Sequence, residues 1–157
     1  MRKILEVNVA GVARTVRPFL PGMLERGSGR ILFVSSVVGK RGLPHYSAYS
    51  ASKFALHGMA DALHAELAGT GVSLGVVCPS STVSEFHDRQ IHEGPGQRRM
   101  RPKRHPVESV SRAIVRMARS RRREMVLSAE GKLVTLVDSL APRLVDRVLA
   151  RVFRKPG

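Results

Sequence analysis

The sequence contains a single cysteine, Cys78, and no tryptophan, and only 4% of its 157 residues are aromatic. One cysteine excludes an internal disulfide framework and permits a reducing compartment. Because aromatic side chains are so few, the 43% of residues that are hydrophobic must build an aliphatic core. This length and this hydrophobic fraction suit one globular domain.

Long apolar runs are also lacking. No stretch approaches the ~20 residues that a membrane-spanning helix needs. At the amino terminus, Glu6 and Asn8 interrupt a stretch that faintly imitates a signal peptide, so no usable apolar segment is left for one. We therefore expect a soluble, cytoplasmic protein, with peripheral attachment to a membrane as an alternative that the sequence leaves open.

Acidic side chains are scarce: 27 basic residues face 12 acidic ones, which gives a net charge of +15. Residues 98–157 carry 17 basic and 5 acidic side chains, a net charge of +12. Such a field attracts nucleic acid, acidic lipid or anionic substrates. The alternative is a solvated surface in an arginine-biased chain. The shortage of aromatic side chains for base stacking favours that alternative, so we expect no nucleic-acid partner.

Apolar spacing predicts helices that alternate with strands. Continuous apolar runs, which are typical of strands buried on both faces, occur at 31–34 and 72–78, and a shorter strand is predicted at 125–127. Positions three to four apart predict helices over 5–23 (bent by prolines), 47–68, 107–119 and 132–155 (broken at Pro142). The alternation favours an α/β fold with a thin parallel sheet of about three strands.

Three residues of this pattern can carry proton chemistry. Tyr49 and Lys53 are four apart on a predicted helix and so share one face. An ammonium beside the phenol favours the phenolate, which can take a proton from an alcohol or return one to a carbonyl. Ser36 follows the first strand, at the sheet edge where open α/β folds bind ligands, and can donate a hydrogen bond to the reacting oxygen.

The sequence from Ile4 to about Leu127 resembles the short-chain dehydrogenase/reductase family. The matching motifs follow the family's order: Val7-Asn8-Val9-Ala10-Gly11, residues 31–36, residues 49–53 and Cys78-Pro79. The resemblance implies a Rossmann-like, doubly wound sheet and an NAD(P)-dependent oxidoreductase that acts on a small carbonyl or alcohol substrate. It implies that Tyr49 is the general acid/base, that Ser36 polarises the substrate oxygen, and that Lys53 lowers the pKa of Tyr49 and holds the nicotinamide ribose. Asn8 would position a water.

The resemblance also implies cofactor contacts after the second strand, at Pro79, Ser80, Thr82 and Ser84, where Ser80 replaces the family's usual glycine. The family's glycine-rich phosphate-binding turn precedes the matched region. We therefore expect a catalytic half, residues 1–130 with a substrate loop at 80–106, that lacks the cofactor-binding half. The edge of the first strand would then be bare, and the isolated chain should associate. We therefore expect a partner that covers this edge, either a second copy of the chain in a homo-oligomer or a different chain that supplies the absent half.

Weaker signals have plain alternatives. The six histidines show no metal-ligand spacing, and Cys78 suits a small core residue, so we expect no metal. His45 could line the substrate mouth, and His87 and Asp88 lie in the predicted substrate loop. The tail over 131–157 is a basic amphipathic helix, which packs on the domain or a second subunit, or lies on an anionic membrane. Besides the oxidoreductase, the alternative function is a non-catalytic fragment that works as a basic interaction module.

Overall fold

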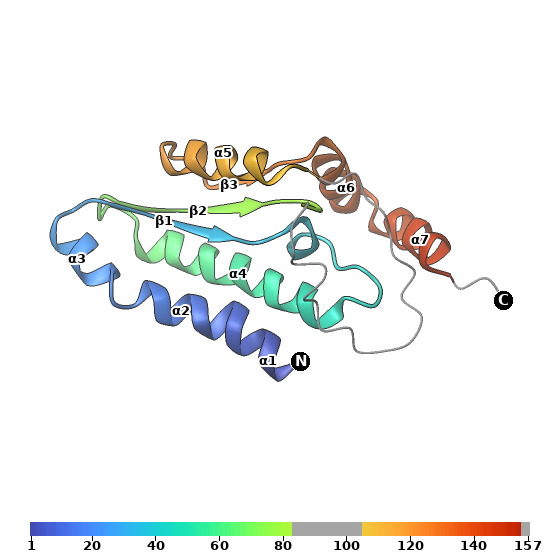
Figure 1. Cartoon of the computed structure of the whole chain (residues 1–157), viewed down its shortest axis with the longest axis horizontal. Helices are drawn as coiled ribbons and strands as arrows, with labels where there is room; N and C mark the ends of the chain where they lie inside the picture. Colours follow the sequence, from blue (N-terminus) through green and yellow to red (C-terminus); the bar gives the residue numbers. More distant parts are fainter. Residues whose placement is uncertain (83–104, 155–157) are drawn as a thin grey trace.

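The computed structural model describes residues 1–82 and 105–154, and its centre is a three-stranded parallel sheet (Figure 1). The strands are β1 (Gly29–Val34), β2 (Val72–Cys78) and β3 (Glu124–Val126), in the order β1-β2-β3. Gly29 pairs with Val72 and Val34 with Val77. The predicted α/β class and the three-stranded parallel sheet are confirmed.

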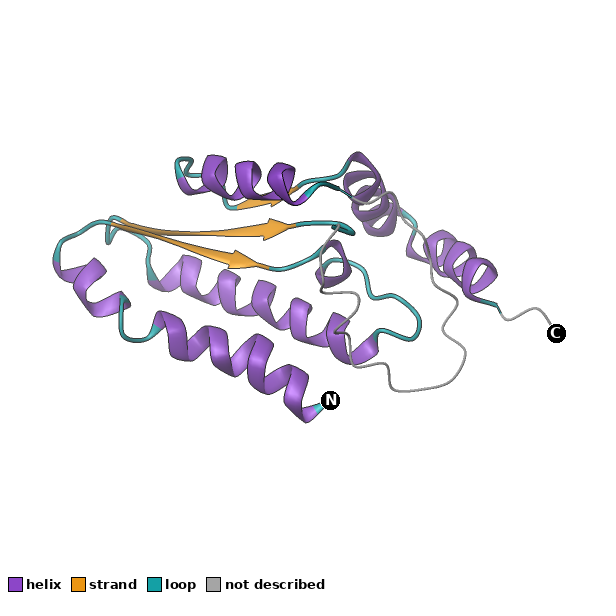
Figure 2. Cartoon of the chain, viewed as in Figure 1, coloured by secondary structure: helices purple, strands orange, loops and turns teal. Residues whose placement is uncertain are grey.

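Helices cover both faces of this sheet (Figure 2). On one side lie α4 (Ser47–Glu66) and, outside it, the run α1 (Arg2–Leu5), a π-helical turn (Glu6–Ala10), α2 (Gly11–Val16) and α3 (Leu20–Glu25). On the other side lies α5 (Val107–Ala118). The two C-terminal helices are α6 (Ala129–Leu140) and α7 (Pro142–Phe153). No helix among the described residues is long and apolar enough to cross a bilayer.

The core lies between α4 and the sheet and is mostly aliphatic, as the composition predicts, with Phe33 as the aromatic member of the described buried cluster. Leu56 and Ala60 of α4 are 1% and 2% exposed, and they pack with Phe33, Leu74 and other strand residues. Each Å² of apolar surface that is removed from water stabilises the fold by about 25 cal/mol. The packing of α4 against β1 and β2 therefore fixes the position of the helix that carries Tyr49.

Two local predictions are wrong. The opening segment is not one bent helix: it contains a π turn and a break at 17–19, and Phe19 is exposed rather than inward. The first strand is not buried along its whole length. Val34 at its end is 45% exposed, because β1 is an edge strand of the described sheet.

The C-terminal helices are tied to the loop that precedes α4. Arg41 in that loop donates from Nη1 to Asp138 of α6 at 2.7 Å and from Nη2 to Asp146 of α7. Val145 of α7 is buried on the domain. The division at residue 130 stays a prediction, and it falls within the first turn of α6.

The exposed edge of β1 leads to a test of association. Unpaired N–H and C=O groups on an edge strand recruit other strands. We expect the isolated chain to self-associate, and Val34→Lys to shift it toward monomer because a lysine on an edge opposes pairing. Sedimentation velocity over a range of concentrations measures both. Val115→Lys on α5, which is similarly exposed, is the matched control. A wild-type chain that sediments as a concentration-independent monomer contradicts this expectation.

Candidate functional site

Strand pairing continues past the ends of β1 and β2 and fixes Ser36. The Ser35 N–H donates to Val77 O at 2.8 Å, and the Val37 N–H donates to Pro79 O at 3.0 Å. Between these two bonds, the Ser36 hydroxyl donates to Pro79 O at 3.4 Å and accepts from the Val38 N–H at 3.3 Å. It caps a short 3-10 turn, Val37–Gly39. Its position at the carboxyl ends of the strands is the one predicted.

Tyr49 and Lys53 lie on the first turns of α4, one turn apart, and meet Ser36. Tyr49 shares a side-chain hydrogen bond with Ser36. The Lys53 Nζ lies 5.6 Å from the centroid of the Tyr49 ring and donates to Val34 O at 3.1 Å. The lysine is therefore held between the carboxyl end of β1 and the phenol. The structure thus brings together the three residues that sequence spacing singled out.

Burial sets the protonation of this pair. It raises the pKa of Tyr49 above the ordinary value of 10.0, and the side-chain hydrogen bond with Ser36 acts in the opposite direction. Burial also lowers the pKa of Lys53, because removing an ammonium from water disfavours its charge. The sequence argument expected Lys53 to lower the pKa of Tyr49. In this structure the net direction for Tyr49 is upward, and Ser36 is the group that opposes it.

Asn8 joins the site through a serine that sequence analysis did not single out. The Asn8 Nδ2 donates to Ser52 Oγ at 3.0 Å, and this hydroxyl donates to Tyr49 O at 2.7 Å. Ser52 is fully buried. Asn8 sits in the π turn Glu6–Ala10, a helical irregularity that often occurs at functional sites. The signal for Ser52 was its place three residues after Tyr49, on the helix face that meets the opening helix.

The predicted cofactor contacts are described only in part. Ser80 follows Pro79, and its Oγ is buried with no hydrogen-bond partner among the described residues. Thr82 Oγ1 donates to Ser80 O at 3.2 Å. Ser84, His87 and Asp88 lie outside the described residues.

His45 lies on the loop before α4. It has a positive φ of 67°, and its ring centroid lies 6.1 Å from that of Phe153 on α7. A non-glycine residue in this backbone region is uncommon. His45 therefore lies beside the C-terminal helix α7.

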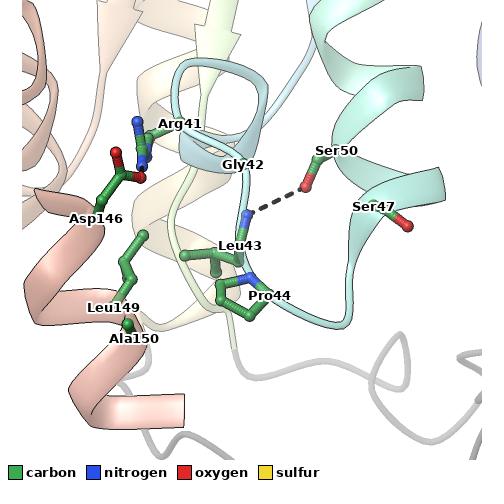
Figure 3. A pocket seen from close by; sticks show the side chains of 9 residues that line it. All are labelled: Arg41, Gly42, Leu43, Pro44, Ser47, Ser50, Asp146, Leu149 and Ala150. Carbon is green, nitrogen blue, oxygen red and sulfur yellow. Dashed lines mark hydrogen bonds and ion pairs between the residues drawn. The ribbon is translucent and has the colours of Figure 1, made fainter. Parts of the chain in front are cut away.

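A cavity of about 360 Å³ opens between the loop before α4 and helix α7 (Figure 3). Ser47 and Ser50 line it from α4, and Leu149 and Ala150 line it from α7. Tyr49 is not among the lining residues, although both serines lie within one helical turn of it. Helix α7 therefore forms one wall of the space beside the Tyr49 helix.

Three side chains from distant parts of the chain meet beside β2. His57 Nε2 lies 3.7 Å from Cys78 Sγ, and His57 Nδ1 lies 3.6 Å from Glu124 Oε2. Donor atoms of these three kinds can share a metal ion. Spacing along the sequence did not predict that the three residues lie close together. Glu124, however, is already paired with Lys40 at 2.9 Å. Burial and the nearby carboxylate raise the pKa of the Cys78 thiol to about 12, so the thiolate that a metal needs is disfavoured.

A family model described as short chain dehydrogenase matches residues 1–93. Ketoacyl reductase HetN from Nostoc sp. is 33% identical over 156 residues, which cover 94% of this chain and 53% of that protein. The chain spans about half the length of the curated relatives that it matches over most of its own length.

Solved structures show the same fold. A short chain dehydrogenase from Burkholderia cenocepacia, in complex with NADP, has a TM-score of 0.76 and 23% identity, over 97% of this chain and 58% of that one. A short chain dehydrogenase/reductase from Burkholderia phymatum, in complex with NAD, has a TM-score of 0.75 and 23% identity, over 89% of this chain and 57% of that one. The Rossmann-like class predicted from the sequence is confirmed.

The burial of Cys78 gives a direct test of its role. The side chain has 0% exposure, and its thiol pKa is raised to about 12. We expect iodoacetamide at pH 8 to leave Cys78 unmodified in the folded chain and to alkylate it fully in guanidinium chloride, because only the thiolate reacts. Intact mass spectrometry measures both states. Rapid alkylation of the folded chain would show a reactive thiol instead of a core residue.

Proposed function

The chain belongs to the short-chain dehydrogenase family, and from this membership we propose that it takes part in hydride transfer between a nicotinamide cofactor and a carbonyl or alcohol carbon. The observation that carries the proposal is the hydrogen bond between Tyr49 and Ser36, with the Lys53 Nζ 5.6 Å from the phenol ring. The similarity to HetN, a ketoacyl reductase, supports a ketone as the substrate class.

In the direction of reduction, Tyr49 donates its phenolic proton to the carbonyl oxygen, and Ser36 donates a hydrogen bond to the same oxygen. Bound NADH or NADPH supplies the hydride that the carbonyl carbon accepts. The raised pKa keeps Tyr49 protonated through neutral pH, which suits a general acid. In the direction of oxidation, the Tyr49 phenolate accepts the hydroxyl proton of the alcohol.

The described residues fit the nicotinamide end of such a cofactor. Lys53 holds an ammonium at the carboxyl end of β1 and has donor hydrogens beyond the one directed at Val34 O. The buried Ser80 Oγ, which has no described partner, needs a hydrogen bond that a bound group can provide. We propose that Lys53 and Tyr49 hold the ribose and that Pro79, Ser80 and Thr82 border the nicotinamide. The solved relatives support either NAD or NADP.

Asn8 acts in this proposal as a positioning residue. Its amide is bound to Ser52, and Ser52 is bound to the backbone of Tyr49. Asn8 therefore joins the opening helix to the helix that carries the acid. A water held by its remaining polar atoms would extend the proton path from Lys53 toward solvent.

The second candidate is a non-catalytic interaction module, and one observation favours it. Leu144, Val148 and Val152 of α7 are half exposed beside Arg147 and Arg151, although Val145 packs on the domain. This exposed strip suits a second subunit or an anionic membrane surface. A homo-oligomer and peripheral membrane attachment both remain proposals, as does a cytoplasmic location.

Tyr49→Phe separates the two candidate functions. General acid/base catalysis contributes about 10²–10⁴-fold, so we expect a loss of at least about 100-fold in ketone reduction. The assay follows NADPH and NADH oxidation with an acetoacetyl thioester. Tyr46→Phe removes the only other tyrosine hydroxyl and is the matched control, expected to keep full activity. Equal activity in the two variants would refute the role of Tyr49, and a wild-type chain that neither binds nor oxidises either cofactor would refute catalysis by this chain.

Ser36→Ala tests whether the Ser36 hydroxyl lowers the pKa of Tyr49. Alcohol oxidation needs the Tyr49 phenolate, and a pKa above 10.0 makes that form a minority between pH 7 and 10. The oxidation rate should therefore climb about tenfold for each pH unit. Removing the Ser36 hydrogen bond removes the influence that lowers this pKa, so the profile of Ser36→Ala should move to higher pH. Ser36→Thr keeps a hydroxyl and should keep the wild-type profile. A shift of Ser36→Ala to lower pH would contradict the assignment.

A further inference from the structure

A second cavity lies at the opposite end of the sheet from Ser36 and Tyr49. It has a volume of about 330 Å³, at the small end of the range of about 300–1,000 Å³ for ligand sites. It is bordered by the amino ends of β1 and β2, the end of α4 and the turn before β3. Four of its lining side chains are basic: Arg30, His64, Arg121 and Arg123. None of the described residues that line it is acidic.

Arg30 is held in this cavity by the sheet itself. It lies on β1, and its side chain crosses β2: Nη1 donates to Leu74 O at 2.9 Å and Nη2 donates to Arg122 O at 2.5 Å. Gly75 makes the crossing possible, because a Cβ at that position would lie 2.6 Å from Arg30 Nη2. The Arg30 Nε is buried with no hydrogen-bond partner among the described residues. The Arg30 guanidinium is thus held in a fixed place beside the cavity.

The positive charge around Arg30 is uncompensated. Within residues 1–82 and 105–154, no carboxylate forms an ion pair with Arg30, Arg121 or Arg123. Burial and then the charge of Arg121 lower the pKa of Arg30. At His64, burial and Arg123 lower the pKa, while Asp61, one turn away on α4, acts in the opposite direction. Like charges that converge without a counter-ion are relieved by an anion.

We propose that this cavity is a binding site for a phosphate group, carried by a small phosphorylated molecule. Guanidinium groups present donors in a planar fork that matches phosphate oxygens, and several of them around one recess suit a doubly charged oxyanion. The turn 69–71 lines one side of the cavity, and Gly71, with a φ of 79°, passes so close to Gly27 that no side chain fits there. A cavity of about 330 Å³ suits a compact phosphorylated molecule better than an extended lipid or nucleic-acid surface. The site is separate from the proposed oxidoreductase chemistry, which lies at the carboxyl ends of the strands.

Isothermal titration of the full 157-residue chain with pyrophosphate, in phosphate-free buffer at low salt, tests this site. We expect saturable binding, and at least tenfold weaker binding for the double variant Arg121→Gln/Arg123→Gln, whose side chains are exposed. The matched control is Arg112→Gln/Arg116→Gln on α5, whose side chains are also exposed; it loses the same charge elsewhere and should bind within twofold of wild type. Circular dichroism checks that both variants are folded.

Three results would overturn the proposal. No saturable binding of pyrophosphate to the wild-type chain is the first. Equal weakening in the two double variants is the second, because it would show general attraction by net charge. The third is found by sedimentation with phosphatidylglycerol vesicles: binding to vesicles that depends on Arg121 and Arg123, with no binding of free pyrophosphate, would identify a lipid headgroup as the ligand.

Discussion

The parallel pairing of β1 with β2, carried two residues beyond the strands, is the constraint on which the rest of the candidate site depends. The bonds to Val77 O and Pro79 O leave the backbone around Ser36 no freedom to move away from Pro79. Because this backbone is already ordered, a ligand that binds here does not have to offset the entropy lost in ordering it; this is the basis of pre-organisation. Tyr49 then needs only the packing of α4 on the same two strands to meet Ser36.

Electrostatics at this site follow from burial more than from neighbouring charge. The pKa of Tyr49 rises and that of Lys53 falls for the same reason, which is loss of water around each group. Both shifts favour the neutral forms, so each group is harder to ionise here than it would be in water. The Ser36 hydroxyl is the one described group that counteracts this for the phenol. The ionisation of the tyrosine is therefore coupled to the serine that it contacts.

Sequence alone predicted the elements whose signals are local. The four-residue spacing of Tyr49 and Lys53 defines a helix face, and the apolar runs of β1 and β2 define strands, so these could be read directly. The π turn around Asn8 has no such signal, and the hydrogen-bond partner of the Asn8 side chain, Ser52, lies 44 residues away along the chain. The meeting of His57, Cys78 and Glu124 likewise depends on three elements at once. The exposure of Val34 departs from the burial that its apolar run predicts but agrees with the bare edge expected for the first strand, because burial depends on which strands lie alongside.

Gly75 shows how one absent side chain links distant parts of the chain. It sits in the middle of β2, where glycine ordinarily weakens a strand, yet a methyl group there would collide with both Arg30 and Met117 of α5. The position therefore couples a strand, a helix and a crossing guanidinium. Substitutions at positions 30 and 75 should therefore have non-additive effects on stability, because a side chain at position 75 would force the ends of Arg30 and Met117 to move.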